Sequence, residues 1–220
     1  MMESILGVDR YCKKADSPAE KFNNTLRSSA KCRFIASDRL RTLDVVTSHT
    51  TTILSLVMIL IPLLQVAGVK FHTSSELLMA IQIFIAVCIL VYSVINTQAK
   101  YAVRAEKLNV CGNKIQQLQR KLYEDMSRGD EFDLGYYRQM YDEIEVDSEN
   151  HARSDFYFAK LRLNHIYEVT KFRRLYVWVN AVKRASFSYV DMIILYIFVV
   201  CMVLEILTGA SPLNILARIG

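Results

Sequence analysis

Residues of polar or small character recur at helical spacing along two long uncharged stretches of the chain, Val45 to Val69 and Leu77 to Ala99. Alternating steps of four and three residues place them on one face of each helix. The positions are Thr51, Ser55, Met58, Pro62 and Gln65 in the first stretch, and Gln82, Ala86, Ile89, Ser93, Asn96 and Lys100 in and just after the second. Such groups can line a wetted pore and replace an ion's hydration shell, or they can hydrogen-bond between packed helices without any pore. Both interpretations stay open at this stage.

Three further residues invite a chemical interpretation. His151 and Asp155 are one helical turn apart, which could suit a metal, but no third ligand is evident and packing or capping is favoured. Glu205 lies in an apolar stretch, where it could line a pore or carry protons, or simply snorkel near a helix end. The sequence has no GxGxxG, P-loop, HExxH or GxSxG motif. We therefore expect neither a cofactor nor a metal, and no enzyme activity.

The two uncharged stretches predict a transmembrane hairpin over residues 45–99. At 1.5 Å per residue each reaches roughly 35 Å as a helix, against roughly 30 Å of hydrocarbon. The connector, Lys70 to Glu76, leaves room only for an antiparallel turn. If the turn centres on Thr73, Gln65 lies level with Gln82 and His49 with Asn96.

A third apolar stretch begins at Phe187, and we expect a third membrane helix over 187–208 with a tail over 209–220. Asp191 and Glu205 leave between them fewer uncharged residues than the ~20 of a typical span. Snorkelling and local thinning of the bilayer could accommodate both acids. An interfacial or re-entrant helix is the alternative.

Outside these stretches the sequence predicts helices. Residues 1–16 form a loosely ordered arm, and Ser17-Pro18-Ala19-Glu20 is a helix start with a capping box, which begins a helix over 17–44. The region 100–186 continues the second membrane helix and breaks near Ser127 to Asp130. It then forms a short helix over 134–145 and a long one over 151–186. The fold class is an all-α membrane protein whose hairpin continues into a cytoplasmic helical bundle.

A heptad repeat follows directly after the hairpin. Its members are Tyr101, Leu108, Ile115 and Leu122, with Cys111 and Leu118 at the intermediate position. Such a repeat is a seam for packing against another helix. The partner helix could belong to a second copy or to the same chain.

Charge predicts the orientation. Both flanks of the hairpin are rich in Lys and Arg, whereas the turn carries only Lys70, so the N-terminus and the 100–186 region should be cytoplasmic. The net charge of +5 fits this rule and contact with anionic lipid, and we expect no direct nucleic-acid partner. The start of the chain lacks a signal peptide, so the first membrane helix should direct insertion without processing. The five cysteines show no CxxC spacing and should be reduced, structural thiols.

The order of a basic helix, Arg33 to Leu40, a membrane hairpin and then Arg104 to Leu108 resembles the SLATT family of bacterial two-transmembrane effector domains, which associate with SMODS and SLOG proteins. Asn150-His151, followed by Asp155-Phe156 and Lys160-Leu161, is similar to family 5 of that group. The positions that carry the resemblance are Arg33, Arg39, Arg104, Glu106, Asn150, His151 and Asp155. The third apolar stretch departs from a two-helix description.

The resemblance implies a membrane effector of a bacterial antiviral, abortive-infection type system. Such effectors are thought to permeabilise the inner membrane when a partner triggers them, such as a nucleotide-signalling or reverse-transcriptase protein. Three spans cannot enclose a channel, so conduction would require a homo-oligomer. The alternative is a non-conducting, membrane-anchored interaction or sensor subunit.

Overall fold

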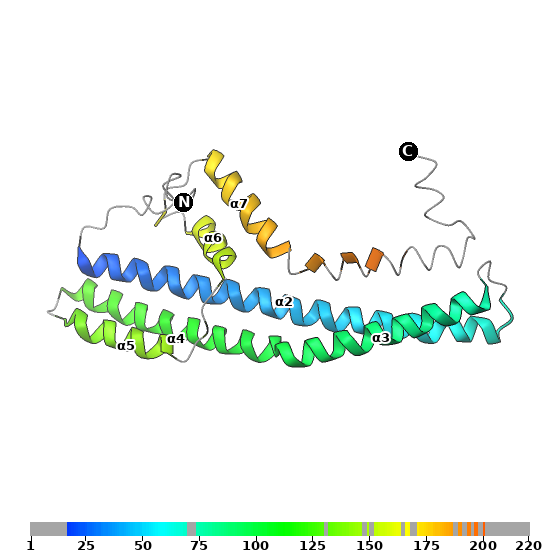
Figure 1. Ribbon diagram of the computed structural model, residues 1–220. Coiled ribbons are helices and arrows are strands. Elements are labelled where there is room, and N and C mark those ends of the chain that lie inside the picture. The colour runs from blue at the N-terminus through cyan, green and yellow to red at the C-terminus, as the bar shows by residue number, and fades with distance from the viewer. Residues whose placement is uncertain are drawn as a thin grey trace. The chain divides into compact units, whose positions relative to one another are not determined.

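The computed structural model describes residues 17–69, 74–129, 132–146, 149, 152–163, 166–167 and 171–186, with several positions between 189 and 200. Its helices are α2 (Pro18–Val66), α3 (Ser75–Ala99), α4 (Tyr101–Arg128), α5 (Leu134–Val146), α6 (Arg153–Arg162) and α7 (Lys171–Ser186), as Figure 1 shows. No β-strand occurs in these described ranges. The all-α fold class predicted from the sequence is confirmed.

The chain divides into two compact units. One contains residues 1–41 and 102–187, and the other contains residues 42–101 and 188–220. Helix α2 therefore contributes its first part to one unit and its remainder to the other.

In the first unit, α4 and α5 lie alongside the beginning of α2 (Figure 1). Helix α2 begins as predicted, since the Ser17 hydroxyl accepts a 3.1 Å hydrogen bond from the amide of Glu20. The core is formed by buried apolar residues of the three helices, namely Leu26, Ala30, Cys111, Ile115, Leu118, Leu122 and Tyr137. Burial of these side chains, rather than helix propensity alone, holds the helices together.

Gly112 allows α4 to pack closely against α2. A Cβ at this position would lie 2.9 Å from Cε1 of the Phe34 ring, closer than a methyl group tolerates. The missing side chain is therefore part of the fit between the two helices.

The second unit contains the hairpin. Residues of α2 and α3 meet through Leu54, Ile61, Leu78 and Ile85, all buried. The Ser74 hydroxyl caps α3 by accepting from the amide of Leu77. Thr50, also buried, donates a 3.2 Å hydrogen bond to the Tyr196 hydroxyl.

Two described helices are long and apolar enough to cross a membrane, α2 and the run that begins with α3. Their apolar side chains are largely uncovered by protein, since Leu56 is 62% exposed and Leu90 is 66% exposed. A core helix of a soluble protein would be buried, so these surfaces suit lipid contact.

The prediction of one long helix over 151–186 is wrong. Helix α6 ends at Arg162, where Leu163 takes φ −101° and ψ 58°, and α7 begins at Lys171. Ile166 is buried in the connection, and the Tyr167 hydroxyl lies 3.0 Å from that of Ser28 on α2. The break in the helix therefore gains tertiary contacts that a continuous helix would forgo.

The expected continuation of the second membrane helix beyond residue 99 is found, with one interruption at Lys100. Lys100 takes a left-handed conformation, φ 47°, between α3 and α4. For a residue with a side chain this costs roughly 1–2 kcal/mol. Lys100 is the single residue between the two helices.

The expected break near residues 127–130 and the short helix after it are found. Gly129 adopts φ 73° directly after α4, and α5 begins at Leu134. The arm 1–16, Asp191, Glu205 and the tail 209–220 lie outside the described residues. Positions 189–200 that are described are helical, and whether 187–208 spans the membrane stays a prediction.

Candidate functional site

The polar positions of the hairpin fall into two groups. Asn96 is half-buried, and its Oδ1 accepts a 3.0 Å hydrogen bond from the hydroxyl of Thr47, which is buried. Sequence reasoning put His49 at this level, but the side chain of His49 is exposed. The contact between Thr47 and Asn96 therefore shifts the pairing of α2 with α3 by two residues along α2, relative to the predicted pairing.

Ser55 and Gln82 are also half-buried within the hairpin. The Ser55 hydroxyl donates to the carbonyl of Thr51, 2.9 Å away on its own helix. The Nε2 atom of Gln82 is buried and has no hydrogen-bond partner among the described residues. Asn96 thus belongs to the contact between α2 and α3, and Ser55 and Gln82 are partly covered within the hairpin.

The remaining candidates on these helices are not covered by this chain. Gln65, Ser93 and Lys100 are exposed, as is Thr52 on α2. The predicted polar stripe is therefore divided between the helix interface and the outer surface of the hairpin. Glu205 lies outside the described residues.

The heptad seam is filled within the chain. Leu108, Ile115 and Leu122 are buried, and Ile115 and Leu122 belong to the core that also contains Leu26 and Ala30 of α2. Tyr101 is half-buried. These three leucine and isoleucine side chains are thus buried within a single chain.

Charged residues join α2 to α6. The Arg39 guanidinium contacts the Asp155 carboxylate through two hydrogen bonds, Nε to Oδ1 at 2.9 Å and Nη2 to Oδ2 at 3.1 Å. Asp155 is fully buried and also accepts from the amide of Ala152, at 2.9 Å, before the first turn of α6. Its buried carboxylate thereby accepts three hydrogen bonds, two from an arginine and one from a helix start.

A second set of charges involves Glu145 of α5 and Glu149. Arg33 is buried, donating from Nη2 to Glu145 at 3.1 Å and from Nη1 to the backbone carbonyl of Glu149. Arg104 of α4 binds both carboxylate oxygens of Glu149, at 3.0 and 3.1 Å. We call these contacts, together with the Arg39–Asp155 pair, the arginine network. Glu106 lies apart from it, in an exposed 4.0 Å pair with Arg41.

Tyr141 extends this network. Its hydroxyl donates to Glu145 at 2.6 Å and lies 2.7 Å from the hydroxyl of Ser29. Burial and the neighbouring Glu145 carboxylate raise the pKa of Tyr141 to about 12. The phenol therefore stays protonated and serves as a hydrogen-bond donor.

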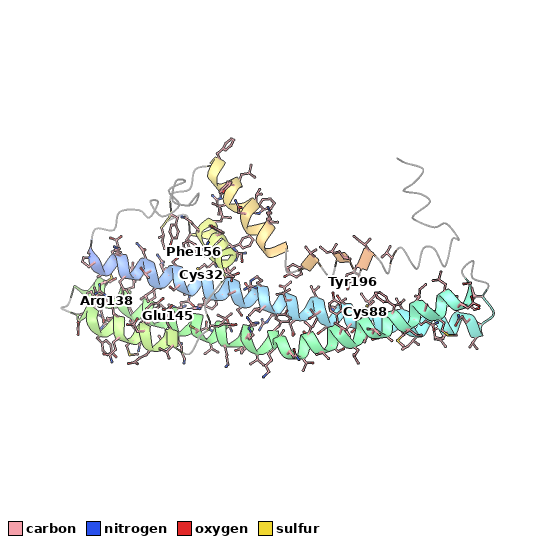
Figure 2. The ribbon with its side chains drawn as sticks, viewed as in Figure 1. Cys32, Cys88, Arg138, Glu145, Phe156 and Tyr196 are labelled. Atoms are coloured by element: carbon pink, nitrogen blue, oxygen red, sulfur yellow. The ribbon has the colours of Figure 1, made fainter. Side chains whose placement is uncertain are left out.

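Apolar and cation–π contacts complete the attachment of α6. Cys32 and Ile35 of α2 form a buried cluster with Ala159, and Phe156 packs against it (Figure 2). Burial, with a smaller contribution from Asp155, raises the pKa of the Cys32 thiol to about 12, so this cysteine is inert at neutral pH. Buried Lys160 lies over the rings of Phe156 and Tyr167, at 5.9 and 5.2 Å from their centroids.

Five of the seven positions that carry the family resemblance are described. Four of them enter the arginine network, and the fifth, Glu106, pairs with Arg41 apart from it. Asn150 and His151 lie outside the described residues. Asp155 is committed to Arg39, and the described residues contain no group of three or more metal-ligating side chains. Sequence reasoning missed Glu145 and Glu149, although the carboxylates after Tyr141 were a signal for partners of the α2 arginines.

The geometry defines a class of protein: an all-helical membrane protein that contains a two-helix hairpin and a helical unit held together by arginine–carboxylate pairs. The family model described as the SMODS and SLOG-associating 2TM effector domain, family 5, matches residues 15–208, and the chain belongs to this family. It is accordingly a membrane effector of antiviral systems. Neither a curated protein nor a solved structure matches the chain.

Proposed function

We propose that this protein oligomerises in the bacterial inner membrane and forms a pore that permeabilises it when a partner protein triggers the complex. The partner would be a nucleotide-signalling or reverse-transcriptase protein that acts on the cytoplasmic residues. In this proposal the N-terminus is cytoplasmic, and the effector acts on the membrane rather than by catalysis.

The observation that carries the proposal is the exposure of polar side chains on helices of membrane length. Thr52 on α2 and Ser93 on α3 are both uncovered by the single chain, and the Thr52 hydroxyl donates a 2.9 Å hydrogen bond to the Ser48 carbonyl of its own helix. Polar groups in membrane helices normally face protein or water, because lipid cannot satisfy them. A second copy would cover them, and several copies could arrange them around water.

The arginine network supports a route for the trigger. Arg33 and Arg39 lie on α2, the same helix that supplies the first membrane-spanning segment. A partner that displaces α6 or the segment around Glu149 would remove the hydrogen bonds of these arginines. The loss of these hydrogen bonds would then act on α2, which continues towards the bilayer.

The test is membrane depolarisation in cells that express the chain with its trigger, followed with a potential-sensitive dye. The variant Thr52→Leu/Ser93→Leu makes both helices more apolar, so insertion should be preserved. Depolarisation should be abolished, because a hydrophobic constriction can dewet and close. The matched control, Ile53→Leu/Val94→Leu, changes the neighbouring exposed residues and should depolarise like the wild type.

Undiminished depolarisation by the double variant would make these residues a helix-packing surface. If the wild type never depolarises cells while its partner is active, the pore proposal fails. The non-conducting interaction subunit would then take its place.

A further inference from the structure

Helix α7 carries a broad apolar face that the described protein leaves uncovered. Phe172 is 90% exposed, and Leu175, Tyr176 and Val179 are 60%, 53% and 49% exposed. These positions are separated by three or four residues and so share one side of the helix. A contiguous exposed face of large apolar side chains marks an interaction surface.

The opposite side of α7 is attached to the protein. Val177 is buried, and the Arg174 guanidinium donates a 3.0 Å hydrogen bond to the carbonyl of Leu161 on α6. Figure 2 shows α7 with its side chains next to α6. Because the opposite side of α7 contacts α6, the apolar face points away from α6.

The charge of α7 indicates what the face binds. The helix contains Lys171, Arg173, Arg174, Lys183 and Arg184, and no acidic residue. A basic amphipathic helix of this kind is typical of a segment that lies in the interface of an anionic membrane.

Two further features favour lipid over an acidic protein. Tyr176 and Trp178 are aromatic residues with polar edges, which concentrate at the level of lipid headgroups. The chain also continues from Ser186 directly into the apolar stretch that begins at Phe187. Whether that stretch spans the bilayer or lies in its interface, it brings the end of α7 to the membrane.

We propose that α7 lies along the surface of an anionic bilayer, with Phe172, Leu175, Tyr176 and Val179 inserted between the headgroups. The ligand class is anionic phospholipid. This inference requires that the chain sits in a membrane but not that it conducts ions, so it can fail or succeed independently of the pore.

Trp178 provides the test, because it is the single tryptophan of the chain and is 52% exposed at the edge of the apolar face. The full-length protein is reconstituted into vesicles of phosphatidylcholine with phosphatidylglycerol, some carrying brominated acyl chains. We expect blue-shifted emission and strong quenching by bromines placed near the headgroups, with weak quenching by acrylamide in the water. In vesicles of phosphatidylcholine alone, quenching by brominated lipid should fall at least twofold.

A matched pair of substitutions isolates the apolar face. Val179→Glu should reduce quenching by brominated lipid at least twofold, because it places a charge within the inserted face. Val110→Glu introduces the same charge at a 42% exposed position of α4 and should leave the quenching unchanged.

Quenching by acrylamide as strong as in urea-unfolded protein, with none by brominated lipid, would show that α7 faces water and would overturn the proposal. Protection from both quenchers would overturn it as well, since a second copy or a partner protein would then cover the face. Equal lipid quenching with and without phosphatidylglycerol would remove the role assigned to the basic residues.

Discussion

Arg39 on α2 and Asp155 on α6 are joined by two parallel hydrogen bonds although 116 positions separate them in sequence. The carboxylate is completely buried, whereas the Arg39 side chain is 23% exposed. A planar guanidinium matches a carboxylate in this bidentate geometry better than an ammonium can. The pair therefore fixes both the position and the orientation of α6 on α2.

Asp155→Ala should lower the free energy of unfolding by about 3 kcal/mol, the low end for a broken buried pair, because the partly exposed Arg39 can turn to water. Thermal unfolding of the detergent-solubilised protein measures this. Arg41→Ala removes an exposed pair with Glu106 and is the matched control, expected to have little effect. Equal losses from both variants would contradict the special position of Asp155.

The reactivity of the Cys32 thiol should report whether α6 is packed against α2. In a chain whose other cysteines are replaced by serine, its modification by a thiol reagent at pH 8 should be far slower than for an unfolded control. Because the pKa is raised to about 12 from the ordinary 9.0, the thiolate forms only as the pH approaches 12, and the rate should rise there rather than near 9. Adding Asp155→Ala should accelerate the reaction at pH 8 about tenfold or more. An unchanged rate would mean that α6 stays packed against α2 without the Arg39–Asp155 pair.

The contact between Gly112 and Phe34 predicts that the effect of Gly112→Ala on stability changes sign when Phe34 is replaced by a smaller residue. Gly112→Ala should destabilise the protein, because overpacking costs about 1–3 kcal/mol and outweighs the gain of about 1 kcal/mol in helix propensity. With Phe34→Leu in the background, the same substitution should stabilise, since the ring edge is gone. Denaturant unfolding of the four proteins in this cycle measures the coupling, and additive effects would refute the contact.

Ile115→Asp should unfold the unit that contains α4 instead of dissociating chains. The side chain is completely buried in the core formed with α2, so the charge has neither water nor a partner. Limited proteolysis should cut this variant rapidly, whereas Gln117→Asp, at an exposed position of the same helix, should resist like the wild type. A folded Ile115→Asp protein of smaller assembly size would instead restore the seam as a contact between copies.

Membrane orientation can be tested with single introduced cysteines. The excess of Lys and Arg on both flanks of the hairpin predicts that Thr73→Cys is labelled by an impermeant reagent applied from outside intact cells. Asp130→Cys should be labelled only after the membrane is permeabilised. The reverse pattern would invert the proposed topology.

The sequence by itself determined the hairpin, the all-helical class and the family, because each depends on local properties. Apolar runs longer than the bilayer is thick, heptad spacing and cap residues such as Ser17 all act through near neighbours. The order of elements and charges around the hairpin was sufficient to indicate the family that matches residues 15–208.

Only the tertiary structure decided which residues meet. Local spacing contains no information about Arg39 finding Asp155, or Arg33 finding Glu145, since the chain has to return over more than a hundred positions. The same holds for the break after Arg162. Residues 151–186 all tolerate a helix, and the burial of Ile166 and the Ser28–Tyr167 hydrogen bond, which are long-range interactions, favour the interruption over continued helical hydrogen bonding.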